Sequence, residues 1–299
     1  MDALSIQNVS KNYGEFKALD NINLQVKQGD FVGLLGVNGA GKTTLISAMS
    51  GVKRFDGQIK IHGHDVVNDP VAARYNLGVV PQELAFDPFL TVYKTLKLQS
   101  GLYGVKNNDA WIEELVERMY LKDKIDANTR GLSGGMKRRL MVAQALVHKP
   151  PVIILDEPTA GVDVELRKNL WEFIKSLHTA GHTILLTTHY LEEVEELCNK
   201  IIMIDKGKIL AESSKHDLIN KLHNLPTALE LEFLDNKHLP TELSQLVIQQ
   251  NKSSYTLKLD GNDILVDILN LCKERGLRLG NINIHKPNLE DIFINYIKR

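Results

Sequence analysis

The stretch Gly-Val-Asn-Gly-Ala-Gly-Lys-Thr at residues 36–43 constrains the fold of this chain more than any other feature. It follows an apolar segment typical of a short strand, residues 31–35, and precedes a helical pattern at residues 44–50. A G-x-x-x-x-G-K-[ST] spacing between a strand and a helix is typical of a phosphate-binding P-loop. The sequence therefore predicts an α/β fold whose main sheet carries a polyphosphate site.

The residue types in this loop suit a polyphosphate. Glycines let the backbone curve tightly and bring its N–H groups close to the anion, and the helix N-terminus adds unpaired donors and the positive end of its dipole. Lys42 is placed to reach the β- and γ-phosphates, and the Thr43 hydroxyl to bind the accompanying Mg²⁺. The alternative, a glycine-rich turn with an incidental Lys-Thr pair, is disfavoured by the flanking strand and helix. The predicted contacts are Gly36, Asn38, Gly39, Ala40, Gly41, Lys42, Thr43 and Thr44.

Length and composition limit the remaining choices. A chain of 299 residues, 43% of them apolar, can bury one large and one smaller domain, or two domains of similar size. Its net charge of −1 gives no basic excess, so no nucleic-acid partner is expected. Cys198 and Cys272 are too few and too far apart for a metal cluster and suit a reducing cytosol. No apolar run approaches the roughly 18 residues that span a bilayer, so a membrane role requires a partner.

Polar residues follow three further segments that have the pattern of buried strands. Gln82 follows the first segment, Asp156 and Glu157 end the second, and His189 follows the third. These strands are expected at residues 77–80, 152–155 and 183–188. Because ligands of open α/β sheets bind at the carboxyl ends of the strands, we expect all four side chains at the edge that carries the P-loop.

The pair of carboxylates has a mechanistic interpretation beside a P-loop. Asp156 would hold the Mg²⁺, directly or through water, and Glu157 would orient and polarise the attacking water. The alternative is an exposed acidic strand end, although the desolvation cost of two carboxylates after a buried strand argues against it. His189 is placed to donate to a γ-phosphate, but a capping or surface histidine fits its sequence context as well.

Two other features have both a structural and a functional interpretation. Ser133, in the stretch 131–136, is a good N-cap for the amphipathic helix that follows, and the small residues beside it also suit an anion at a helix N-terminus. Spacing alone does not choose between these. Tyr13 lies in a Lys-Asn-Tyr-Gly turn between two expected strands, residues 3–9 and 18–26, where it either stacks on a nucleotide base or packs against the protein.

Taken together, these motifs resemble the ATP-binding subunit of an ABC transporter over residues 1 to about 215. The matching motifs are Walker A at 36–43, the Q-loop at Gln82, the ABC signature at 132–136, Walker B at 152–157, the D-loop at 160–163, the switch histidine His189 and the adenine-stacking aromatic Tyr13. The resemblance implies a P-loop NTPase core of ABC type, with an antiparallel β subdomain and a helical subdomain at about 88–150. Met136 and Val37 depart from the commonest residues of the family, but neither change removes a phosphate-binding group.

The resemblance also implies a mechanism and partners. Two copies would pair head to tail, so that Ser133, Gly134 and Gly135 of one copy complete the ATP site of the other. Asp163 would contact the second copy. Gln82 would sense the metal and the water and face the permease. Lys42, Gln82, Glu157 and His189 form the expected catalytic set, and Thr43, Gln82 and Asp156 the expected Mg²⁺ set.

Within the superfamily, the chain is most similar to the multidrug and daunorubicin-type subunits that work with ABC-2-type permeases. This implies a protein on the inner face of the cell membrane, held there by a separate permease, with export as the default direction. The alternatives are a soluble ABC ATPase acting on ribosomes or DNA, and a regulatory module that does not hydrolyse ATP. The first usually has two nucleotide units or a coiled-coil insertion, and the second is disfavoured by Glu157 and His189.

A separate small α+β domain is expected at residues 216–299. Strand patterns occur at 229–234, 255–259 and 282–285, and helical patterns at 264–272 and 289–297. Because this segment has no paired carboxylates and no ligand cluster, a packing or dimer-contact role is favoured over a small-molecule sensor.

Overall fold

The computed structural model describes two compact units, Met1–Lys215 and His216–Arg299. Each unit has a hydrophobic core of its own. The described residues are 2–84, 86–188, 191–218, 227–234, 239–251, 254–259 and 262–285.

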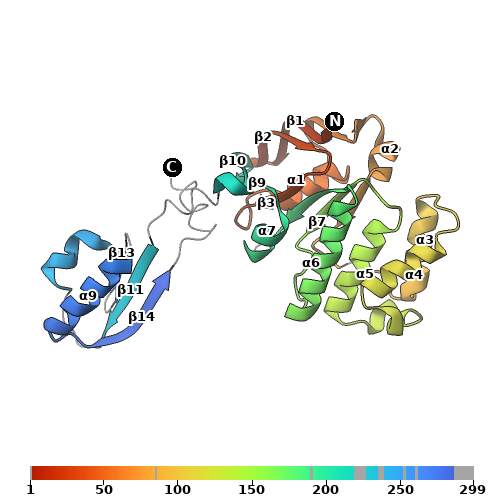
Figure 1. Ribbon diagram of the computed structural model, residues 1–299. Helices are drawn as coiled ribbons and strands as arrows, with labels where there is room; N and C mark the ends of the chain where they lie inside the picture. The colour runs from red at the N-terminus through yellow and green to blue at the C-terminus, as the bar shows by residue number, and fades with distance from the viewer. Residues whose placement is uncertain are drawn as a thin grey trace. The chain divides into compact units, whose positions relative to one another are not determined.

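A six-stranded sheet forms the centre of the first unit, with the strand order β10-β9-β3-β8-β7-β6 (Figure 1). All neighbours pair in parallel except β10, which is antiparallel to β9. The strands are β3 (Phe31–Leu35), β6 (Leu77–Val80), β7 (Val152–Asp156), β8 (Thr183–Thr187), β9 (Lys200–Asp205) and β10 (Lys208–Ser214). Every residue of β3, β7 and β8 is buried, as expected for continuous apolar runs in a parallel sheet covered on both faces.

A second, antiparallel sheet has the order β2-β1-β4-β5. Its strands are β1 (Asp2–Tyr13), β2 (Phe16–Lys27), β4 (Asp56–Ile61) and β5 (His64–Asp65). The first two strands are longer than the sequence patterns predict, and Tyr13 pairs with Phe16 at the end of a hairpin. The prediction that Tyr13 lies in a turn is therefore wrong: the turn is at Gly14, which has a φ of 58°.

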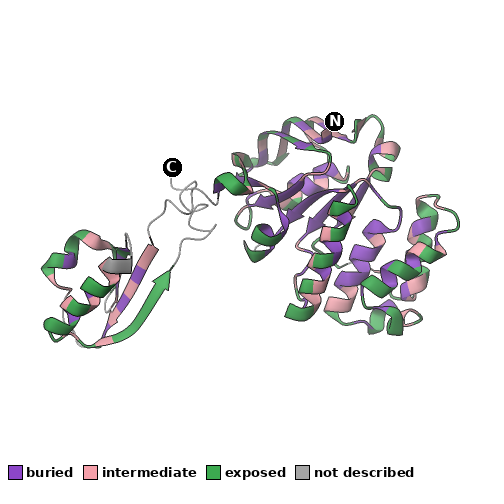
Figure 2. Cartoon of the chain, viewed as in Figure 1, coloured by how far each residue is buried: buried purple, intermediate pink, exposed green. Residues whose placement is uncertain are grey.

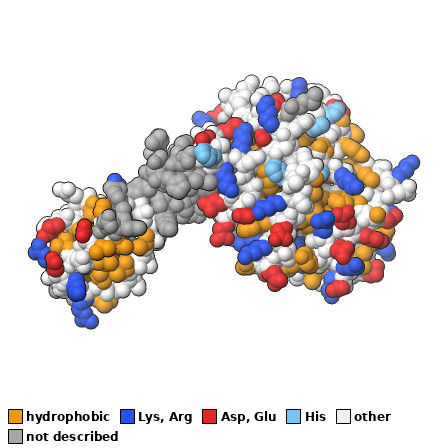
Figure 3. All heavy atoms as spheres, in the orientation of Figure 1, with side chains coloured by type: hydrophobic (Ala, Val, Ile, Leu, Met, Phe, Trp, Pro, Cys, Tyr) orange, Lys and Arg blue, Asp and Glu red, His pale blue; other side chains and the backbone are white. Residues whose placement is uncertain are grey.

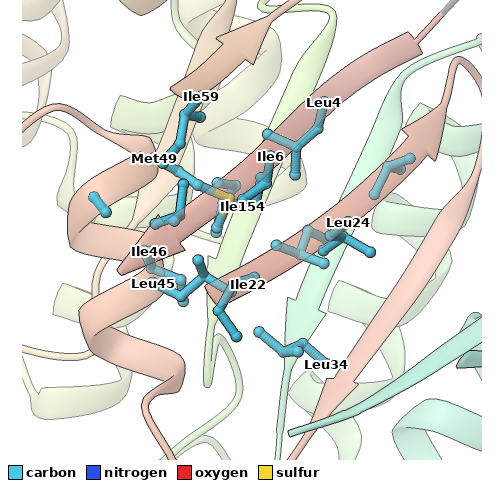
Figure 4. Packing of buried hydrophobic residues seen from close by; sticks show 14 of the residues in the cluster. Leu4, Ile6, Ile22, Leu24, Leu34, Leu45, Ile46, Met49, Ile59 and Ile154 are labelled. Carbon is cyan, nitrogen blue, oxygen red and sulfur yellow. The ribbon is translucent and has the colours of Figure 1, made fainter. Parts of the chain in front are cut away.

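The core of this unit lies between the two sheets and contains helix α1 (Lys42–Met49). Leu45, Ile46 and Met49 of α1 point toward apolar side chains of β1 and β2 and toward Ile154 of β7 (Figure 4). Full burial of a side chain of this size contributes about 1.5 to 3 kcal/mol. The P-loop is therefore joined at both ends to buried elements, β3 before it and α1 after it.

Helices form the rest of the first unit. The expected helical region at 91–120 is two helices, separated near Gly104 and Asn107, both of which have positive φ. Helices α3, α4 and α5 lie together beside the central sheet (Figure 1). The helices are α2 (Pro70–Tyr75), α3 (Val92–Leu102), α4 (Asp109–Arg118), α5 (Gly134–Leu146), α6 (Val164–Thr179) and α7 (Leu191–Leu197), with short 3-10 turns at Lys122–Lys124 and Thr129–Gly131.

The second unit contains a four-stranded antiparallel sheet in the order β12-β13-β11-β14, packed against helix α9. Its elements are β11 (Thr227–Phe233), the 3-10 helix Thr241–Leu246, β12 (Val247–Gln250), β13 (Ser254–Leu259), α9 (Asn262–Glu274) and β14 (Leu279–His285). The sequence patterns did not predict β12, whose residues are mostly exposed, and β14 is also mostly exposed (Figure 2). The expected helix at 289–297 lies outside the described residues.

Candidate functional site

The P-loop connects the end of β3 to the start of α1 and leaves backbone donors without a side-chain cap. The N-cap of α1 is Gly41, which has a φ of 109° and no capping side-chain hydrogen bond. Lys42 Nζ bends back and donates to the carbonyl oxygens of Gly36 and Val37, at 2.6 and 3.2 Å. Because the lysine is held over its own loop, its ammonium group lies beside the uncapped helix start, where an anion would be stabilised.

Two glycines of this loop are required by close contacts. A Cβ on Gly36 would lie 2.5 Å from the carbonyl oxygen of Ile204, and a Cβ on Gly41 would lie 2.8 Å from that of Ala18. Contacts this short would displace the backbone. The positive φ of Gly41 adds a second reason, because other L residues rarely adopt it.

Asp156, at the carboxyl end of β7, is a buried carboxylate that faces the P-loop helix. Its side chain is 2% exposed and accepts hydrogen bonds from the hydroxyls of Thr187 and of Thr43, the latter at 3.4 Å. Burial raises the pKa of Asp156 above its usual value, and the hydrogen bond from Thr187 opposes this shift. A cation between Thr43 and Asp156 would stabilise the charged carboxylate.

Glu157 has an unusual backbone conformation that fixes the direction of its side chain. Its φ is 51°, in the left-handed region, and its N–H donates to the carbonyl oxygen of Thr187 at 3.0 Å. Such a conformation costs about 1 to 2 kcal/mol for a residue with a Cβ. Gln82 Nε2 donates to Glu157 Oε2 at 3.4 Å, so the residue that follows β6 reaches the carboxylate that follows β7. Strain at a polar residue of a sheet edge is typical of functional sites.

Charges of both signs lie close together at this edge. Burial lowers the pKa of Lys42, while the carboxylates of Glu157 and Asp156 oppose that shift. One ammonium group therefore faces two carboxylates across a partly buried space. A polyphosphate with its divalent cation would add charges of both signs here.

Arg138 of α5 anchors the segment around Gln82. Its Nη1 donates to the carbonyl oxygen of Pro81 at 2.6 Å, and its Nη2 donates to that of Gln82 at 2.7 Å. The Arg138 residue is 4% exposed. The role of Arg138 could not be predicted from the sequence, because the residues that it contacts are more than 50 positions away. These two hydrogen bonds join α5 to the backbone at Gln82.

The P-loop and the side chains of Gln82, Asp156 and Glu157 line one cleft of about 410 Å³. Tyr13 and Phe16 line one part of the cleft, and they are 45% and 64% exposed. Phe16 was missed by the sequence analysis, although an aromatic residue three positions from Tyr13 was a usable signal. The lining residues are Tyr13, Phe16, Ala18, Asn38, Gly39, Ala40, Gly41, Lys42, Thr43, Thr44, Gln82, Asp156 and Glu157. The prediction that Gln82, Asp156 and Glu157 lie beside the P-loop is confirmed. Gly36 belongs to the loop but does not line the cleft. His189 lies outside the described residues.

The signature and D-loop residues are not among those that line this cleft. Ser133 is the N-cap of α5, and its Oγ accepts a hydrogen bond from the N–H of Met136 at 3.2 Å. Asp163 caps α6 by accepting from the N–H of Leu166 at 3.0 Å. The two segments are neighbours, since a Cβ on Gly135 would lie 3.4 Å from the carbonyl oxygen of Gly161. The capping role of Ser133 is therefore observed, and a second role would need a group from outside this copy.

Comparisons with known proteins match the whole length of the chain. Residues 19–160 match the ABC transporter family, and residues 221–297 match the C-terminal domain of DrrA1-3-like ATP-binding proteins. The linearmycin resistance ATP-binding protein LnrL of Bacillus subtilis is 33% identical over 99% of this chain and 98% of its own length. This chain belongs to the family of ABC transporter ATP-binding proteins.

Other members and their structures agree with this assignment. The Nod factor export ATP-binding protein I of Cupriavidus metallidurans is 36% identical over 99% of this chain and 97% of its own. A solved dimeric structure of a bacterial ABC transporter cassette matches with a TM-score of 0.65 and 25% identity, over 71% of this chain and 98% of its own. The predicted ABC-type P-loop fold is confirmed. Within the described residues, no helix has the length and apolar character needed to cross a membrane.

As an ABC ATPase, the chain binds ATP, and the donor set of the cleft also fits Mg²⁺. The Thr43 hydroxyl, the Asp156 carboxylate and the Gln82 amide supply the oxygen atoms that this hard cation prefers. Thr43 and Asp156 are already within 3.4 Å of each other. The uncapped start of α1 and the Lys42 ammonium suit the phosphates.

Proposed function

We propose that this protein hydrolyses ATP in a head-to-tail dimer and thereby drives export through a separate ABC-2-type membrane permease. The observation that carries the proposal is the convergence of the P-loop, Asp156, Glu157 and Gln82 on one cleft. A module that only bound ATP would not need a glutamate at the sheet edge with a strained backbone and a side chain held by a glutamine.

In the proposed site, the groups of this chain divide phosphate binding, metal binding and water activation among them. The N–H groups of residues 39–43 and the Lys42 ammonium bind the β- and γ-phosphates, for which Lys42 exchanges its bonds to Gly36 and Val37. Thr43, Asp156 and Gln82 would hold Mg²⁺, which would supply positive charge beside the phosphates. The Glu157 carboxylate accepts a hydrogen bond from the attacking water and orients it, and Gln82 holds that carboxylate. His189 donates to the γ-phosphate.

A second copy would complete the site. The helix α5 begins at Ser133 with small residues, Gly134 and Gly135, and these do not line the cleft of their own copy. Pairing head to tail would bring this helix start to the γ-phosphate of the other copy, where its N–H groups and dipole stabilise negative charge. Asp163, close to the same segment, would contact the partner. The similarity to a dimeric cassette supports this arrangement.

The proposed permease-binding surface is a groove beside Gln82. A cavity of about 260 Å³ is lined by residues from α1, α2, β6, α3 and α5, including Arg74, Pro81, Gln99, Tyr103 and Met141. Large apolar side chains are exposed in α2, in α3 and in the segment before α3; they include Val71, Tyr75, Leu84, Phe89, Leu98 and Leu102. Figure 3 shows hydrophobic side chains scattered over one face of the first unit. A partner bound here would sense ATP through Pro81, which precedes Gln82 and is held by Arg138.

Export and the location on the inner face of the membrane rest on the relatives. Two of them are named for linearmycin resistance and for Nod factor export, and both align over nearly the entire chain. We propose that the second unit, residues 216–299, contributes contacts to the dimer and does not bind a small molecule. Acidic and basic side chains are interspersed on the face of the protein seen in Figure 3, which does not favour a nucleic-acid surface there.

Purification of a trapped complex tests the proposed function. The tagged Glu157→Gln protein would be isolated with ATP from detergent-solubilised membranes of its own host, and co-purifying chains identified by mass spectrometry. Recovery of a polytopic membrane protein in stoichiometric amount supports the proposal and identifies the permease. The Lys42→Ala/Glu157→Gln protein is the matched control and should lose the ATP-dependent part of the recovery. Recovery only in the soluble fraction, with ribosomal or DNA-bound proteins, would replace the proposal by a soluble ABC ATPase.

A further inference from the structure

Glu193 is a buried carboxylate that the proposed mechanism does not use. It lies in α7, is 0% exposed, and its Oε1 accepts hydrogen bonds from the Thr159 hydroxyl and from Trp171 Nε1, the latter at 3.1 Å. In the described part of the chain, its Oε2 is buried without a hydrogen-bond partner. Burying a carboxylate with one oxygen unpaired is costly, so an apolar residue such as leucine would be expected if the position served packing alone.

The two residues of this contact are close in sequence to two residues of the proposed catalytic set. Thr159 follows Glu157 by two positions, in a turn where the N–H of Ala160 donates to the carbonyl oxygen of Glu157 at 3.2 Å. Glu193 follows His189 by four positions. The Thr159–Glu193 hydrogen bond therefore joins the segment after β7 to the segment after β8.

Helix α7 is itself tightly packed, so its position is well defined. A Cβ on Gly33 of β3 would lie 3.0 Å from Cys198 Sγ and 3.1 Å from Val194 Cγ1. Val194 is 0% exposed and Cys198 is 3% exposed. With α7 fixed against the strand that leads into the P-loop, a hydrogen bond from α7 can fix the loop that carries Glu157.

We propose that Glu193 is a positioning residue for ATP hydrolysis. Through Oε1 it holds Thr159, and through Thr159 it fixes the turn 157–163, which contains Glu157 at one end and Asp163 at the other. Trp171 of α6 keeps the carboxylate oriented. Glu193 does not touch ATP in this scheme, and its effect on turnover rests on the proposed function.

The chemistry of the contact predicts a specific order among variants. Both donors bind the same oxygen, so the amide oxygen of Glu193→Gln can replace Oε1, whereas Glu193→Ala leaves two donors unpaired. We expect kcat of Glu193→Ala to fall about ten- to a hundredfold with little change in KM, because misplacing a catalytic group by about 1 Å costs that much. Glu193→Gln should stay within about threefold of the parent. Thr159→Val should lower kcat more than Trp171→Phe, since only Thr159 adjoins Glu157.

A matched control uses the other link between α6 and α7. Lys175 of α6 forms an exposed ion pair with Glu196 of α7. Exposed pairs of this kind contribute little, so Glu196→Gln should leave kcat and KM unchanged. If Glu196→Gln lowered kcat as much as Glu193→Ala, general loosening of α7 would explain the data and the proposal would be wrong. Equal losses in Glu193→Gln and Glu193→Ala would also overturn it, because the charge and not the acceptor would then matter.

A second readout does not depend on hydrolysis. Amide hydrogen exchange of residues 157–163 should become faster in Thr159→Val and Glu193→Ala than in the parent, while exchange of β3 and α1 stays the same. Unchanged exchange at 157–163 would refute the positioning role even in an active protein. If the parent proved unable to hydrolyse ATP but exchange at 157–163 were still faster in the two variants, only the proposed function would be rejected. The role of the Thr159–Glu193 contact in fixing the turn would stand.

Discussion

The first unit contains two glycine-containing helix starts, and they differ in what surrounds them. Helix α1 begins at Gly41 without a side-chain cap, in a cleft that also contains Lys42, Asp156 and Glu157. Helix α5 begins at Ser133 with a side-chain cap and is absent from that cleft's lining. The first lies among the groups that we propose to be catalytic, and the second has none of them in its own copy. This difference supports the proposal that the second helix start serves another copy of the chain.

The largest effect should come from removing the base at the first helix start. Glu157→Gln keeps the shape and the contact with Gln82 but cannot polarise water, so kcat should fall about 10²- to 10⁴-fold. ATP binding should stay intact, and the protein should accumulate as an ATP-bound dimer, measured by size-exclusion chromatography with light scattering. Hydrolysis at the parent rate would show that another residue orients the water.

Loss of the lysine should affect binding and not only turnover. Lys42→Ala removes the one ammonium that faces the two carboxylates of the cleft and the phosphates of ATP. Charge-assisted hydrogen bonds of this kind are worth about 1.5 to 3 kcal/mol, so the Kd for ATP should rise about ten- to a hundredfold, measured by calorimetry. An unchanged Kd would place the phosphates elsewhere and contradict the assignment of the cleft.

The proposed role of Ser133 in the partner's ATP site can be tested with a variant that still caps α5. Aspartate caps helices as well as serine does, so Ser133→Asp should retain the thermal stability of the parent. Its charge would oppose the γ-phosphate of the partner's ATP, and dimer formation and kcat should fall about tenfold or more, with monomer Kd unchanged. Thr91→Asp, at the capped start of α3, is the matched control and should keep parent activity. If Ser133→Asp were as active as Thr91→Asp, Ser133 would only cap the helix and would not contact the partner's ATP.

The features that could be predicted from sequence are those encoded by neighbouring residues. The P-loop was predictable because its glycines, Lys42 and Thr43 all lie within eight successive residues, 36–43. Strands β7 and β8 were predictable because their apolar runs are continuous. The rule that ligands of α/β sheets bind at the carboxyl ends of the strands predicted that Gln82 and Glu157 lie at one edge, and the structure brings their side chains within 3.4 Å.

The missed features depend on contacts through space. Thr187 holds both Asp156 and Glu157 from the adjacent strand, and Arg138 holds Pro81 from a helix far along the chain. Neither contact has a spacing that a sequence pattern records. Strand β12 was missed because its residues are mostly exposed at a sheet edge, so burial imposes no alternation on them.

The smallest expected effect concerns the aromatic residues that line the cleft at the first helix start. Tyr13 ends β1 and Phe16 begins β2, and they are 45% and 64% exposed, so a base could stack on either ring. Lys11 Nζ lies 5.2 Å from the centroid of the Tyr13 ring. Tyr13→Ala and Phe16→Ala should each raise the Kd for ATP about two- to tenfold, since an aromatic contact is worth about 0.5 to 1.5 kcal/mol. Binding of inorganic tripolyphosphate, which has no base, should be unchanged in both. Phe89→Ala is the control, because Phe89 is 85% exposed and is absent from the cleft lining. If tripolyphosphate affinity fell with that of ATP, the rings would act by shaping the P-loop, and the adenine would have to bind elsewhere.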